Sequence, residues 1–208
     1  MKRMNKCVLM LIAALVLFSL SSEALAQRPR MGLQFGMGGG TYAPIDPEEY
    51  FDKATMLALD FQLFFDISGI RLGLTVGYTP LVVDLTYTDG WGFTYTDQFT
   101  YVFLPIMGDF SVMPLRFFMP NLAFQFLVGA HLGVFNWSVL DEEDIGDSHF
   151  AFGPKLGLEF FVGEWFVIGL EGRYVMVTAD SEYPDSNLGF MNALLSLRFR
   201  IPLIKREF

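Results

Sequence analysis

Two histidines are the side chains of this chain best suited to act as catalytic bases near neutral pH. His149 directly follows Asp147 and Ser148, so one tripeptide holds the residue types of a nucleophilic relay. Such a relay depends on spatial geometry, which neighbours in the sequence rarely provide. The other histidine, His131, lies in a glycine-spaced apolar segment without a serine beside it. We therefore predict that the protein is not an enzyme.

Nine charged residues form a more regular pattern, because each alternates with apolar residues along its segment. They are four acids and five bases: Asp60, Arg71, Asp109, Lys155, Glu159, Glu171, Arg173, Arg198 and Arg200. If these side chains share the interior of a barrel, they can form either a structural network or an ion path. We favour a network, since unpaired buried charges are costly and an eight-stranded barrel is only wide enough for side chains to fill.

No cofactor or metal site is predicted. The most acidic run, at 141–147, is the best candidate for binding a divalent cation. It lacks the alternating oxygen ligands and the glutamate at position 12 that a calcium loop uses. A solvated loop surface is the simpler interpretation.

The stretch 150–178 shows which elements must position the charges. Apolar and aromatic residues alternate there with glycine, Lys155, Glu159, Glu171 and Arg173, on both sides of a short connection at 162–164. A period of two over about ten residues on each side of a tight turn predicts a β-hairpin. In a soluble sheet its apolar face would be core, whereas in a membrane barrel that face would meet lipid.

The same alternation recurs along the chain and predicts eight strands. We place them at 31–39, 55–66, 70–78, 101–112, 122–137, 150–160, 166–176 and 194–201. Connections two, four and six are short, and the other four are long and contain 15 of the 23 acidic residues. Within the second long connection, 81–87 and 93–95 could extend the neighbouring strands beyond a bilayer. Short turns at one end and long loops at the other are typical of outer-membrane barrels.

Aromatic residues on the apolar faces give an independent indication. Phe65, Phe110, Phe124, Phe126, Phe160, Phe166 and Phe199 fall near the short turns, whereas Tyr78, Phe150, Phe152 and Tyr174 fall near the long loops. Two aromatic belts with aliphatic residues between them are expected of a lipid-facing wall. A soluble lipocalin-like barrel is the alternative, but its outer surface would then carry glycine and little charge.

Residues 1–26 have the pattern of a cleaved export signal. Lys2, Arg3 and Lys6 precede a run of about 14 mostly apolar residues, shorter than the roughly 20 of a spanning helix, and Ala24-Leu25-Ala26 offers a cleavage site. The predicted mature domain, 27–208, has 11 basic and 22 acidic residues, a net charge of −11 and no cysteine. That acidity argues against a nucleic-acid partner.

The sequence also resembles a known family. The stretches VFLPIMGDF (102–110), FLVGAHLGVF (126–135) and LLSLRFRI (194–201) are similar to strands of the OmpA/OmpX-like superfamily of small outer-membrane β-barrels, in particular its PorT-like group. The resemblance implies an all-β fold, an eight-stranded antiparallel up-and-down transmembrane barrel. It also implies insertion by the barrel assembly machinery through a C-terminal aromatic signal, for which Phe199 and Phe208 are the two candidates.

Together these features predict a monomeric, non-enzymatic protein of the outer membrane with a side-chain-filled lumen. It would contact membrane lipid and lipopolysaccharide, and use its long acidic loops in a structural, surface-interaction or assembly and secretion role. A narrow transporter for small apolar molecules is the alternative, with Trp91, Phe93 and Tyr95 shaping its mouth. A lipid-modifying enzyme is a third class, and it would require a serine within reach of His131 or His149.

Overall fold

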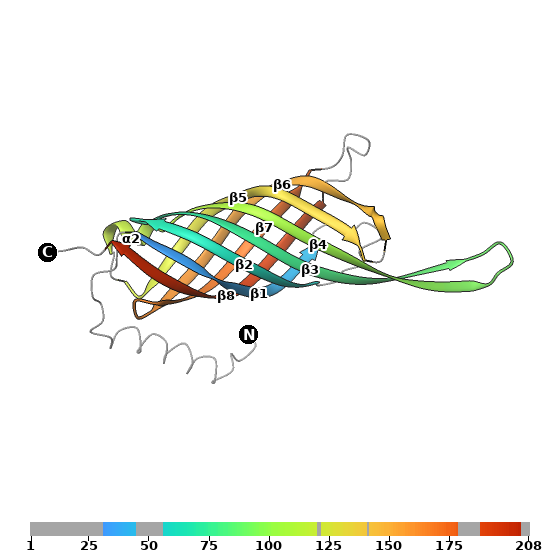
Figure 1. Cartoon of the computed structure of the whole chain (residues 1–208), viewed down its shortest axis with the longest axis horizontal. Helices are drawn as coiled ribbons and strands as arrows, with labels where there is room; N and C mark the ends of the chain where they lie inside the picture. Colours follow the sequence, from blue (N-terminus) through green and yellow to red (C-terminus); the bar gives the residue numbers. More distant parts are fainter. Residues whose placement is uncertain (1–30, 45–55, 120–121, 141, 179–187, 205–208) are drawn as a thin grey trace, which may run out of the picture.

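A computed structural model describes residues 31–44, 56–119, 122–140, 142–178 and 188–204. In these ranges eight strands pair in sequence order as an antiparallel sheet, and β8 pairs with β1 to close a barrel (Figure 1). The predicted strand number and up-and-down order are thus confirmed. The predicted export signal, the first long loop at 45–55 and most of the fourth lie outside the described residues.

Six of the eight strands are longer than the sequence pattern indicates, and the second and fifth keep the predicted length but begin one and two residues later. The strands are β1 (Met31–Pro44), β2 (Met56–Ile67), β3 (Ile70–Thr88), β4 (Thr94–Val112), β5 (Phe124–Val139), β6 (Glu142–Val162), β7 (Phe166–Val177) and β8 (Leu188–Ile204). One short helix, α2 (Pro114–Phe118), lies between β4 and β5. No helix in the described ranges is long and apolar enough to cross a membrane.

The β2–β3 connection shows how a short turn sets the register. Ile67 pairs with Ile70, so only Ser68 and Gly69 form the turn. Both have positive φ, 47° and 102°. Two successive residues with positive φ match the twist of the flanking strands in two-residue hairpins, and glycine adopts that conformation without steric cost.

The barrel wall exposes apolar side chains and buries polar ones, the reverse of a soluble protein. Along β2 the residues alternate strictly, with Leu57, Leu59 and Phe61 exposed while Ala58 and Asp60 are buried. The predicted belts lie on this outer surface: Phe110, Phe124 and Phe166 are exposed near the short turns, and Tyr78 and Phe150 are exposed near the long loops. An apolar exterior around a polar interior is the arrangement of a barrel surrounded by lipid.

Two of the connections predicted to be long form paired strands in the structure. β3 and β4 continue as a two-stranded hairpin that runs far past the barrel wall, as the extension of 81–87 predicted (Figure 1). The acidic run at 141–147 was predicted to be a loop, but β6 begins at Glu142, which pairs with Val139 after a register shift. An acidic composition indicates exposure to solvent, and a hairpin beyond the barrel wall can be exposed just as a loop can.

Strand β4 departs locally from the regular ladder. Val76 pairs with Ile106 and Thr79 with Phe103, but no pairs are formed between these positions, where Pro105 lies. Proline has no N–H to donate to the neighbouring strand. Val102 is buried beside Pro80 and Ser138, although Leu104 and Ile106, which share its strand parity, are exposed.

Candidate functional site

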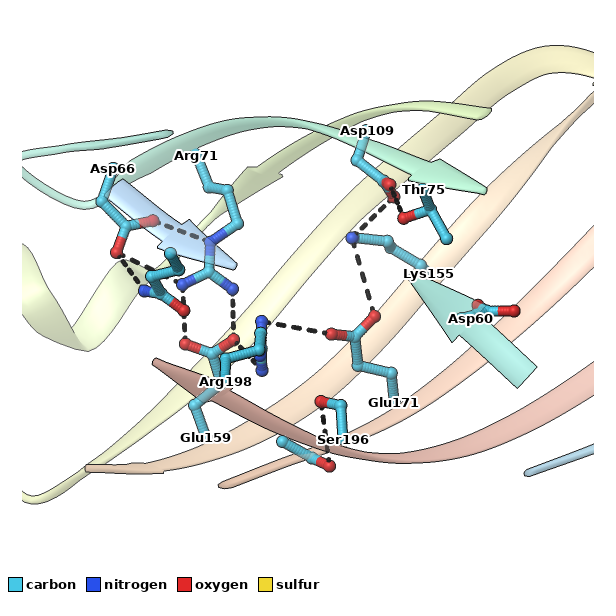
Figure 2. A network of polar contacts seen from close by, with 12 residues as sticks. Asp60, Asp66, Arg71, Thr75, Asp109, Lys155, Glu159, Glu171, Ser196 and Arg198 are labelled. Carbon is cyan, nitrogen blue, oxygen red and sulfur yellow. Dashed lines mark hydrogen bonds and ion pairs between the residues drawn. The ribbon is translucent and has the colours of Figure 1, made fainter. Parts of the chain in front are cut away.

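The interior of the barrel collects the charged residues singled out in the sequence. All nine are at most 4% exposed, and they project from six of the eight strands. Ten residues of this region are labelled in Figure 2, where acidic and basic side chains from opposite walls point toward one another.

Arg71 is the centre of the contacts nearest the short turns. Its Nε donates to Asp66 Oδ1 at 2.7 Å, and its two terminal nitrogens both donate to Glu159, with Nη2 to Oε2 at 2.8 Å. Asp66 also accepts from Gln34 and from Arg116 of α2. Paired contacts between one guanidinium and a carboxylate fix orientation as well as distance.

Arg198 joins this group to the next. Its Nη2 lies 2.7 Å from Glu159 Oε1, and its Nη1 lies 3.5 Å from Glu171 Oε1. Glu171 in turn lies 2.9 Å from Arg173 Nη2 and 3.7 Å from Lys155 Nζ. A single arginine therefore connects carboxylates on β6 and β7.

Two further acids complete the chain of contacts. Lys155 Nζ donates to Asp109 Oδ1 at 2.7 Å, and Arg173 Nη1 donates to Asp60 Oδ2 at 2.8 Å. We call the connected set the charged network: Asp60, Asp66, Arg71, Asp109, Lys155, Glu159, Glu171, Arg173 and Arg198. Arg200, the remaining predicted residue, lies over the ring of Phe161 at 5.4 Å from its centroid.

A buried aromatic ring lies inside the charged network. Phe64 is 0% exposed, and three cationic groups surround its ring at 4.9, 5.0 and 5.2 Å from the centroid: Arg71, Lys155 and Arg198. Phe64 pairs across the sheet with Gly73, and a Cβ at Gly73 would overlap this ring. The glycine thus makes room for the phenylalanine, and the ring face offers partial negative charge to the cations.

Sequence analysis missed several residues of this region. Asp66 has the same strand parity as Asp60, so alternation could have identified it, and Phe64 could have been placed inward in the same way. Arg116 had no such signal, because it lies in a connection assigned as a turn. Its inward position depends on how α2 folds across the end of the barrel.

Toward the long loops the interior is apolar, which the sequence interpretation did not foresee. We call this part the apolar cluster: Tyr42, Met56, Ala58, Leu81, Phe103, Met107, Phe135, Ala151, Val175, Val177 and Phe190. Phe135 stacks on Phe190 and tilts against Phe103, each with 5.4 Å between ring centroids. A gap bounded by Tyr42, Phe103 and Phe135 has no space for a water molecule. The rings that border this gap are therefore closely packed.

Among the described residues, neither histidine is hydrogen-bonded to a serine. His131 is buried and pairs across the sheet with Asp109, but neither ring nitrogen has a hydrogen-bond partner among the described residues. His149 Nε2 lies 3.4 Å from Asp147 and 3.4 Å from Trp137 Nε1. Ser148 Oγ instead donates to Asn136 at 2.7 Å, so this tripeptide does not form the relay. The described ranges also hold no group of three or more potential metal ligands.

The tip of the β3–β4 hairpin is exposed to solvent. Asp89 Oδ1 accepts the N–H groups of Phe93 and Trp91 at 2.9 Å each, and Oδ2 accepts the hydroxyl of Tyr95. These donors, the N–H of Phe93 foremost, hold the pKa of Asp89 below its usual range. Trp91 is 89% exposed on the resulting turn.

The same architecture occurs in solved structures of other proteins. Neisserial surface protein A matches with a TM-score of 0.53 at 14% sequence identity, over 83% of this chain and 97% of the other. OprG, an outer-membrane protein of Pseudomonas aeruginosa, matches with a TM-score of 0.52 at 11% identity, over 85% and 98% of the two chains. This is the fold of the small, OmpA/OmpX-like outer-membrane β-barrels. No protein-family model and no curated protein matches the sequence.

Proposed function

We propose that this protein is a non-enzymatic, integral component of the outer membrane with a closed interior. The observation that carries the proposal is the charged network, a continuous series of ion pairs from Asp66 to Asp60 that joins opposite walls of the barrel. Every carboxylate in it contacts at least one cation, so no acid of the network is buried without a counter-charge, as a filled lumen requires.

Packing supports the closed state independently. Eight strands enclose a space that side chains can fill. Here Phe64 and its cations occupy one half, and the apolar cluster occupies the other. A path for ions would need a hydrated route past both, and a path for apolar molecules would need to cross Glu171, Arg173 and Lys155. We therefore favour a structural lumen over a transporter.

The working surface of such a protein is its long-loop end. We propose that the acidic loops and the β3–β4 hairpin carry a surface-interaction or assembly and secretion role. Membrane lipid and lipopolysaccharide would surround the wall, and the barrel assembly machinery would insert the chain. Because closure leaves no unpaired strand edge in the wall, we expect a monomer.

Planar bilayer recording tests the closed lumen. We expect the purified protein to show no steady single-channel conductance. Phe64→Ala alone should also be silent, because the apolar cluster still fills the other half, whereas the triple variant Phe64→Ala, Phe135→Ala, Phe190→Ala should produce steady conductance. Leu195→Ala on the outer face should stay silent. Folding and insertion of each variant are checked by heat-modifiable gel mobility. Steady conductance of the unmodified protein that interior substitutions abolish would overturn the proposal.

A further inference from the structure

The three short connections at one end of the barrel contain little charge. They are 68–69, 113–123 and 163–165, and they contain two charged residues, Arg116 and Glu164. By contrast, 15 acidic residues lie in the four long connections. A surface in water is expected to carry mixed charge. The composition of these three connections therefore suits a less polar environment.

Helix α2 buries its charged side chain and exposes its apolar side chains, the reverse of a surface helix on a soluble protein. Its one charged side chain, Arg116, is buried and reaches Asp66 inside the barrel. Its large apolar residues face outward: Phe118 is 83% exposed, and Phe117 and the adjacent Met119 are 53% and 55% exposed. Neighbouring large apolar residues exposed in this way mark an interaction surface.

The position of α2 is held by the barrel. Met113 is fully buried and its N–H donates to the carbonyl of Gly69 at 2.7 Å. The Phe117 ring lies against Gly69, only 3.3 Å from where a Cβ would be. These contacts fix α2 to the β2–β3 turn, so the outward direction of Phe118 is part of the fold.

The lipid-facing wall carries exposed aromatic residues to the same end of the barrel as α2. The strands that it connects carry the outward Phe110 and Phe124, both exposed. At the same end, half-exposed Trp165 stacks on Phe199 with 5.6 Å between ring centroids. Aromatic residues of this kind gather where hydrocarbon meets the headgroups.

We infer that α2 is an interfacial anchor, with Phe117, Phe118 and Met119 inserted among phospholipids of the periplasmic leaflet. This inference rests on the proposed outer-membrane insertion. Burial of an apolar helical face at the headgroup boundary is driven by the area that it removes from water. Arg116 contributes by bonding inward to Asp66, which removes the only charge from that face.

Spin labelling tests the anchor directly, because the sole cysteine, Cys7, precedes the predicted mature domain. The variant Phe118→Cys is labelled with a nitroxide and reconstituted into vesicles of phosphatidylethanolamine and phosphatidylglycerol. We expect its label to be accessible to oxygen and several-fold less accessible to a water-soluble nickel chelate than a label at Trp91→Cys on the hairpin. Met119→Cys repeats the measurement one residue away.

Leu170→Cys, on the outer wall, separates the two proposals. A label in lipid at Leu170 but in water at Phe118 and Met119 would overturn the anchor alone, and would assign the exposed patch to a periplasmic protein. Labels in water at all three positions in a correctly folded sample would overturn membrane insertion itself. Heat-modifiable gel mobility establishes folding for every variant.

Discussion

The charged network and the apolar cluster fill the same barrel by different physical means. In the charged network, Arg71 is held by directional hydrogen bonds to Asp66 and Glu159, and Arg198 lies at ion-pair distance from Glu159. In the apolar cluster, Phe103, Phe135 and Phe190 are held by ring packing, which depends on volume and shape. The difference predicts that one half is sensitive to the loss of a partner and the other to the loss of volume.

The largest effect is expected where one acid serves two arginines. Glu159→Ala leaves Arg71 and Arg198 buried with fewer partners, and we expect the free energy of unfolding to fall by about 3–5 kcal/mol. Glu159→Gln keeps the volume but removes the charge, so it should cost nearly as much. Denaturant unfolding in vesicles, followed by tryptophan fluorescence, measures both. A loss below about 1 kcal/mol in both variants would show that the pairs contribute little.

A smaller effect is expected from a cavity in the apolar cluster. Phe190→Ala removes a ring that stacks on Phe135 and contacts Phe103, and should lower the free energy of unfolding by about 3 kcal/mol. Phe190→Leu retains most of the volume and should cost about 1 kcal/mol. Equal losses in the two variants would contradict a volume-controlled half.

Replacing the Asp109–Lys155 ion pair by apolar residues would make this part of the charged network depend on packing, as the apolar cluster does. Asp109→Leu or Lys155→Met alone leaves a buried charge without its nearest partner, whereas the double variant removes both. Since buried pairs roughly balance their desolvation cost, the double variant should lose about 1 kcal/mol or less, and each single variant more. A double-mutant cycle on unfolding free energies measures the coupling. Additive losses would show that the two charges act independently.

The smallest effect lies outside both regions, at the hairpin tip. The pKa of Asp89 is lower in the folded turn than in the unfolded chain, so its contribution is present above the ordinary aspartate pKa and is lost as pH falls through the folded value. Amide hydrogen exchange at Trp91 and Phe93, corrected for intrinsic rates, should lose protection over that acidic range. Asp89→Ala should remove the pH dependence and leave unfolding of the barrel unchanged. An unchanged pH profile in Asp89→Ala would contradict this role.

Much of the fold was predictable because strand patterns are local. The alternation at 150–178 and the eight apolar segments follow from residue order, and the structure reproduces them as eight paired strands. The connection lengths differ from the prediction, because the second and third long connections are largely paired as hairpins. Strand parity also placed charged residues such as Lys155 and Glu171 on the inner side. Parity also gives Phe103 and Phe135 the inner side, but Phe190 precedes the predicted eighth strand, so residue order did not reveal that these three rings meet.

Which residues contact one another was decided only by closure of the barrel. Glu159 is 88 residues from Arg71, and Asp60 is 113 residues from Arg173, yet each pair is in direct contact. The stagger between strands sets these pairs, and it depends on every turn and register around the barrel. The same closure places three cations around Phe64 and brings Arg116 of α2 to Asp66. Alternation along a strand determined which side chains point inward, whereas the three-dimensional register determined their partners.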